Sequence, residues 1–112
     1  MTIDIYSQYF NGDCLFNDIK RHAARVILQV TSECGNVEYK VLVTFFPHND
    51  EEDYLITYDA VAEEVLFSGK GRRSKKKEAI YLDQVKEAAD RLAKSLNGTI
   101  DWDNPLRDAQ YA

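Results

Sequence analysis

The sequence predicts a small α+β domain: a helix, a four-stranded antiparallel meander, and a long C-terminal helix packed on one sheet face. Three observations lead to this fold class. Hydrophobic and polar residues alternate along 24–32 and 37–46, as they do in half-buried strands. From Ser74 to Leu96, apolar residues recur every three or four positions, as on one face of a helix. A length of 112 residues suits a single domain, 1–112.

The N-terminal segment is expected to hold a short strand and then a helix. Alternation over residues 2–6 predicts the strand. Residues 13–23 are expected to be helical, with Asn11 or Asp13 as the N-cap. Helical spacing on one face is shown by Leu15, Phe16, Ile19 and Ala23.

The meander is expected to follow, with strands at 24–32, 37–46, 54–59 and 64–68. One face of the first two strands carries most of the apolar residues: Ala24, Val26, Leu28, Val30, Val37, Tyr39, Val41, Val43 and Phe45. The opposite face would present Leu42, Phe46, Leu55 and Leu66. That second face is too apolar to be fully solvated, so it is expected to contact the N-terminal segment, the C-terminal tail or another protein.

The C-terminal helix is expected to begin after Ser74, whose side chain can cap it, and to stop at Asn97-Gly98. Ile100 and Trp102 are expected to lie in an extended segment that packs back on the core. The last residues, about 104–112, are expected to fray.

The charge of the chain is distributed unevenly. The net charge is −5, yet six of the fourteen basic residues lie in one short run: Lys70, Arg72, Arg73, Lys75, Lys76 and Lys77. The other eight basic residues face nineteen acidic ones, so the rest of the chain sums to −11. A concentrated basic region on an acidic body favours a localised anionic partner.

The position of this run strengthens that interpretation. Lys75, Lys76 and Lys77 fall in the first turn of the predicted helix, where the dipole already carries positive charge and disfavours cations. Backbone N–H groups and lysine side chains there converge on one point, which suits an anion such as phosphate. We therefore expect a small non-enzymatic binding module that docks nucleic acid or another phosphate-bearing partner through residues 70–77.

The stretch from Gly69 to Ala79, Gly-Lys-Gly-Arg-Arg-Ser-Lys-Lys-Lys-Glu-Ala, resembles the C-terminal part of the double-stranded RNA-binding domain. In that family a Gly-x-Gly-x-Ser-Lys-Lys-x-Ala stretch joins the last strand of an α-β-β-β-α fold to its second helix. The resemblance implies that Lys75, Lys76 and Lys77 contact phosphates across a duplex groove. This chain has one extra residue between Gly71 and Ser74 and lacks the family's Gly-Pro-x-His loop.

Two other interpretations remain open. The basic run can be a solvated turn that keeps the protein soluble. Alternatively, the protein is a protein–protein interaction or inhibitory domain, or a homodimer, whose partner-binding residues are Phe46, Asp50, Glu51, Glu52 and Asp53. The acidic residues among these form a loop that is expected to be solvated rather than to hold a metal.

The remaining motifs argue against catalysis and membrane insertion. No nucleophile, phosphate-loop or zinc motif occurs, so we expect no enzyme, cofactor, metal or small-molecule substrate. No apolar run approaches the roughly 20 residues of a membrane span. The N-terminus does not resemble a secretory signal, so we expect a cytoplasmic protein with Cys14 and Cys34 as free thiols.

Overall fold

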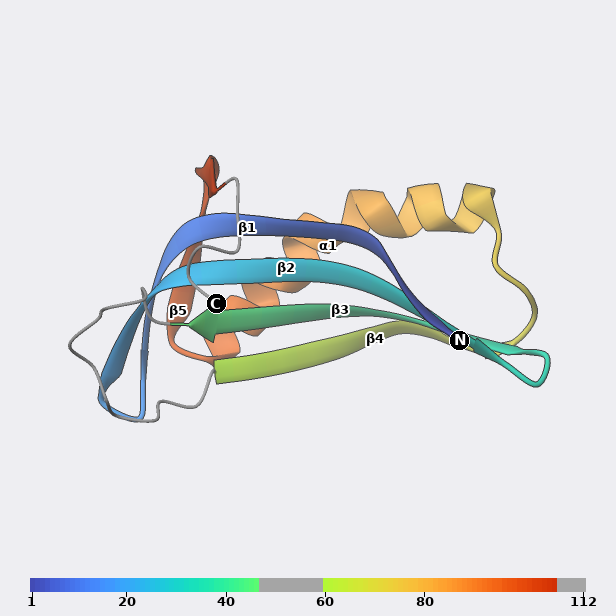
Figure 1. The fold of residues 1–112 in the computed structure, drawn as a ribbon, viewed down its shortest axis with the longest axis horizontal. Helices are drawn as coiled ribbons and strands as arrows, with labels where there is room; N and C mark the ends of the chain where they lie inside the picture. Colours follow the sequence, from blue (N-terminus) through green and yellow to red (C-terminus); the bar gives the residue numbers. More distant parts are fainter. Residues whose placement is uncertain (47–59, 107–112) are drawn as a thin grey trace.

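The computed structural model describes residues 1–46 and 60–106, and it confirms the α+β class: one antiparallel sheet with one helix packed on it. The element order is β-β-β-β-α-β (Figure 1). The elements are β1 (Thr2–Phe16), β2 (Ile19–Glu33), β3 (Asn36–Phe46), β4 (Ala60–Lys70), α1 (Lys75–Ser95) and β5 (Gly98–Leu106).

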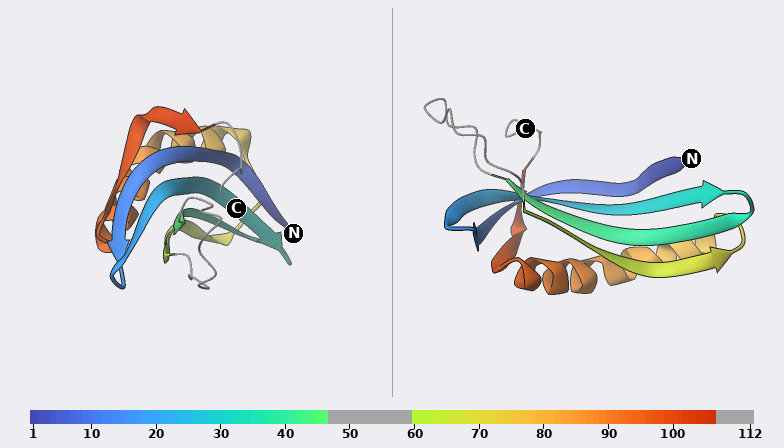
Figure 2. Two further views of the ribbon diagram at one scale, coloured as in Figure 1. Left: turned by 60° about the vertical axis from the view of Figure 1, so that its left-hand side comes forward. Right: turned by 90° about the horizontal axis from the view of Figure 1, so that it is seen from below.

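The five strands form a single sheet in the order β4-β3-β2-β1-β5. Strands β1 to β4 are a meander in which each strand pairs antiparallel with the next. Helix α1 then returns the chain to the opposite edge, where β5 pairs antiparallel with β1. Seen from below, α1 lies along one face of the sheet (Figure 2). This topology leaves β4 and β5 as the two edges of the described sheet.

The helix predicted over residues 13–23 is wrong. These residues form a hairpin, in which β1 ends at Phe16 and β2 begins at Ile19. The two-residue turn between them is Asn17-Asp18, with φ values of 54° and 63°. Asn and Asp tolerate this left-handed conformation, and a pair of such residues favours the tight turn between twisted strands. The apolar spacing that suggests a helix therefore belongs to two strand ends, and α1 is the one helix among residues 1–46 and 60–106.

The strands of the meander also differ from the predicted ones. The first strand of the predicted meander, 24–32, lies within β2, and the strand predicted over 64–68 is the middle of β4. The strand predicted over 54–59 lies outside the described residues. The extended segment after the helix is β5, which reaches Leu106, and its Pro105 and Leu106 pair with Phe10 and Tyr9 of β1.

The core lies between α1 and the inner face of the sheet. The alternation predicted for β2 and β3 is confirmed, because all nine inward residues of that pattern are at most 2% exposed. Helix α1 covers them with a stripe of small and branched side chains: Val85, Ala88, Ala89, Leu92 and Ala93. Leu66 packs against this core, although the sequence pattern predicts it on the opposite face.

Gly98 marks a close approach at the start of β5. A Cβ on this residue would lie 2.8 Å from the Phe45 ring and 3.0 Å from the Asp13 carbonyl oxygen. The chain must pass this tightly because β5 leaves α1 directly over the aromatic core and pairs at once with Cys14 of β1. Glycine is thus required here by space and not by its φ angle.

Candidate functional site: the basic tip

The basic run lies at one end of the elongated sheet, beside the β2–β3 turn (Figure 1). Gly71 N donates a hydrogen bond of 2.9 Å to the Gly35 carbonyl oxygen, which ties the β4–α1 connection to that turn. Gly71 has a φ of 144°, a region that side-chain-bearing residues rarely adopt. We call the six cations of this end the basic tip: Lys70, Arg72, Arg73, Lys75, Lys76 and Lys77.

The helix begins as the sequence predicts. Ser74 is the N-cap, with an extended backbone of φ −139° and ψ 124°. Its hydroxyl oxygen accepts a hydrogen bond of 3.4 Å from Lys77 N, and its carbonyl oxygen accepts one of 2.9 Å from Glu78 N. Two of the helix's first amides are therefore satisfied by one residue. The amides of Lys75 and Lys76 have no hydrogen-bond acceptor within the described chain.

A buried carboxylate lies directly behind the tip. Glu78 is 8% exposed, and its two oxygens accept hydrogen bonds of 3.1 and 3.0 Å from Arg73 Nε and Nη2. The Tyr39 hydroxyl donates a third bond, of 3.0 Å, to Glu78 Oε2. The paired Arg73 guanidinium, aided by the Tyr39 bond, lowers the pKa of Glu78 against the opposing effect of burial. An internal anion thus balances the positive end of the helix.

Tyr39 connects this anion to the sheet. It is fully buried on the inner face of β3, and its hydroxyl oxygen also accepts a hydrogen bond of 3.4 Å from Ser74 N. Burial raises the pKa of Tyr39, so the phenol stays protonated and acts as a donor to Glu78. The sheet, the connection and the helix start are thereby held by one polar network.

This network divides the six cations into two groups. Arg73 is paired with Glu78, and Lys77 Nζ lies 5.2 Å from the centre of the Phe67 ring. Both are therefore engaged within the protein. The remaining four are exposed and form no ion pair within the described chain: Lys70, Arg72, Lys75 and Lys76.

The sequence pattern misses the roles of Glu78 and Tyr39. An acid in the first turn after three lysines is the one available signal for Glu78, because acids are favoured at that position. Nothing local points to Tyr39, which is 39 residues away in the chain.

Most of the alternative partner-binding residues belong to a segment that the structure does not describe. Residues 50–53 lie outside the described residues. Phe46, the remaining member of that set, is 7% exposed and packs edge-on against Tyr9 with ring centroids 5.8 Å apart. Phe46 therefore offers little surface to a partner.

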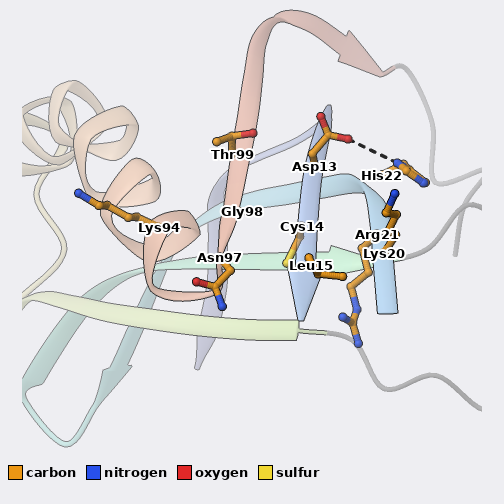
Figure 3. A pocket seen from close by; sticks show the side chains of 10 residues that line it. All are labelled: Asp13, Cys14, Leu15, Lys20, Arg21, His22, Lys94, Asn97, Gly98 and Thr99. Carbon is orange, nitrogen blue, oxygen red and sulfur yellow. Dashed lines mark ion pairs between the residues drawn. The ribbon is translucent and has the colours of Figure 1, made fainter. Parts of the chain in front are cut away.

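The opposite end of the sheet holds a cavity of about 520 Å³ (Figure 3). Asp13 Oδ1 and His22 Nδ1 lie 3.5 Å apart at its rim, on neighbouring strands. Cys14 is buried in its wall, and its thiol donates a hydrogen bond of 3.1 Å to the Leu96 carbonyl oxygen. Burial raises the pKa of Cys14, with Arg21 opposing, so the thiol is protonated and structural.

The described residues offer no group of three or more His, Cys, Asp or Glu side chains placed to bind a metal ion. No described helix is long and apolar enough to cross a bilayer.

The chain matches no protein-family model, no curated protein and no solved structure in the comparisons made. The resemblance of residues 69–79 to the double-stranded RNA-binding domain therefore stays a prediction.

Proposed function

We propose that the protein is a binding module that docks the phosphate backbone of nucleic acid on the basic tip. The observation that carries this proposal is the sorting of the tip's charges. Arg73 and Lys77 are used internally, whereas four exposed cations share one end of the molecule and form no ion pair within the described chain. Because like charges repel one another, an external anion bound among these cations would reduce their repulsion energy.

The internal network supports this proposal by fixing the site in advance. The Glu78–Arg73 pair and the Ser74 cap hold the connection and the first helical turn in one conformation. The side chains of Lys75 and Lys76 therefore project from a fixed backbone, next to the unbonded amides of the same two residues. A phosphate placed there would meet charge, dipole and N–H donors together.

The chemistry of the tip favours backbone contacts over base recognition. Lysine ammonium groups are point charges that bind phosphate with little geometric demand. Contacts to phosphate position a protein on nucleic acid without reading its sequence. We therefore expect weak sequence preference. If all four free cations contact phosphates, log K should fall with log salt at a slope of about −3 to −4.

Fluorescence anisotropy on double-stranded RNA, duplex DNA and single strands, at two salt concentrations, tests the proposal. Lys75→Glu combined with Lys76→Glu should weaken binding at least tenfold. The matched control is Lys20→Glu combined with Lys94→Glu, which changes the net charge equally beside the opposite cavity. Equal losses in both double variants would show that net charge alone matters, and absence of binding at low salt would end the proposal.

A further inference from the structure

The cavity at the end of the sheet opposite the basic tip is formed by segments that lie far apart in the sequence, which is why no sequence motif indicates it. Figure 3 shows side chains of the β1–β2 hairpin on one side, and those of the end of α1 and the start of β5 on the other. Its volume of about 520 Å³ lies within the usual range of small-molecule sites, about 300 to 1,000 Å³. The cavity is therefore large enough for a small ligand.

The lining of this cavity differs in charge from the rest of the chain. Outside the basic tip, the chain has eight basic residues and nineteen acidic ones. Three of these basic residues, Lys20, Arg21 and Lys94, line the cavity. Asp13 is the one acid among the described residues of the lining. The cavity is therefore locally positive on an otherwise acidic body, and such a hollow attracts anions.

The basic side chains outside the tip also differ in whether they have a partner. Most of the described ones are engaged within the chain: Arg25 with Asp4, Lys40 with Glu63, Arg91 with Glu64, and Lys86 with the Trp102 ring. Arg21 is 2% exposed, and its Nη1 donates a hydrogen bond of 2.7 Å to the Phe16 carbonyl oxygen. Lys20 and Lys94 are exposed and form no ion pair or ring contact with the described residues. Both of these lysines line the cavity, where a ligand can reach them.

The backbone acceptors beside the cavity are already used within the protein. At the end of α1, the Lys94 carbonyl oxygen accepts a hydrogen bond from Asn97 N, and the Leu96 carbonyl oxygen accepts one from the Cys14 thiol. The side chains of Asn97 and Thr99 are exposed, line the cavity and form no hydrogen bond with the described residues. The lining therefore offers a ligand mainly cations and polar donors, which suits an anion that carries several acceptor oxygens.

We propose that this cavity binds a small organic phosphate monoester. Such a group carries about −1.5 to −2 charges at pH 7, which matches the two lysines without an internal partner. Lys20 and Lys94 lie on different sides of the cavity (Figure 3), and the flexible lysine side chain lets both ammonium groups turn toward one phosphate. Arg21 adds a positive charge that burial holds in the wall. Leu15, which is 51% exposed, offers an apolar surface to the organic part of the ligand.

Phenyl phosphate titrated into isotope-labelled protein tests the proposal, with backbone amide NMR shifts as the readout and no nucleic acid present. The wild type should show saturable shifts at residues 13–15, 20–22 and 97–99, whereas phenol, which lacks the phosphate, should cause none. Lys20→Gln with Lys94→Gln should weaken binding at least tenfold. Lys40→Gln with Lys86→Gln removes the same charge from two lysines that have internal partners, and it should leave the affinity unchanged.

A third variant separates the apolar contact from the phosphate contact. Leu15→Ser should weaken phenyl phosphate about threefold and leave the affinity for inorganic phosphate unchanged, because it removes apolar surface alone. Absence of shifts at a large excess of phenyl phosphate, or equal losses in the two lysine double variants, would overturn the proposal. Shifts confined to the amides of Lys75 and Lys76 would also overturn it, since the phosphate would then lie on the basic tip. The outcome does not depend on whether the tip docks nucleic acid.

Discussion

The two ends of the sheet differ in how their charged side chains are paired and buried. At the basic tip, one acid is buried and receives three hydrogen bonds from Arg73 and Tyr39, while neighbouring cations remain exposed. At the cavity end, the pair of Asp13 and His22 is exposed, with side-chain exposures of 86% and 50%. Among the buried groups there, the Cys14 thiol donates to the Leu96 carbonyl oxygen and Arg21 Nη1 donates to the Phe16 carbonyl oxygen. The tip therefore combines a buried ion pair with exposed cations, whereas these two buried side chains at the cavity end bond to backbone carbonyl groups.

The largest effect expected at the tip follows from removing its internal anion. Glu78→Ala leaves the Tyr39 hydroxyl buried without its acceptor and Arg73 without its partner. We expect a loss of about 2 to 3 kcal/mol in the free energy of unfolding, measured by urea denaturation. Tyr39→Phe is the matched control and should cost about 1 kcal/mol, because it removes one donor and keeps the ion pair. Equal costs for both variants would contradict the leading role of the carboxylate.

At the cavity end, the stability of the protein should instead be sensitive to added side-chain volume. Gly98→Ala places a Cβ within 3 Å of the Phe45 ring, which is fully buried. We expect a loss of about 1 to 3 kcal/mol, with nucleic-acid affinity unchanged. Gly35→Ala is a comparison without such contact, since nothing lies within 4 Å of its Cβ, although its φ of 77° adds backbone strain. Thermal unfolding of both variants distinguishes steric from conformational cost.

Acidic pH should lower the stability of the fold, because it protonates Glu78 behind the basic tip. Its pKa is lowered in the folded protein from the ordinary value of 4.5, so the carboxylate's stabilisation is present above about pH 4.5. It is lost as the pH falls through the lower folded-state pKa. Glu64, whose pKa is lowered by Arg91, contributes in the same direction. Urea midpoints between pH 7 and pH 3 should therefore fall less steeply in Glu78→Gln than in the wild type, and an unchanged slope would contradict this assignment.

The smallest expected effect separates function from stability at the tip. Lys75→Glu with Lys76→Glu should change the free energy of unfolding by no more than about a few tenths of a kcal/mol per site, since acids suit a helix N-terminus while Lys75 also attracts Glu78. The same variant should lose nucleic-acid binding. Calorimetric unfolding of the variant used in the anisotropy measurement checks this. A clear loss of stability would mean that these lysines support the fold.

Sequence pattern alone predicts the parts of this fold that depend on local periodicity. Strands β2 and β3 follow from their alternation, and α1 follows from its apolar spacing and the Ser74 cap. The hairpin of β1 and β2 is mispredicted, because the short apolar run around Asn17-Asp18 fits the period of a helix as well as that of a strand. The sequence shows the six cations of the basic tip, but it does not show which of them are engaged within the protein and which have no internal partner.

The sequence by itself thus determined the class of the fold, its central strands, its long helix and the place where positive charge gathers, since each depends on neighbours in the chain. Tertiary structure decided which strands became edges and which cations stayed free. The physical reason is distance along the chain: the Tyr39–Glu78 bond and the β1–β5 pairing join segments that only the folded sheet brings together.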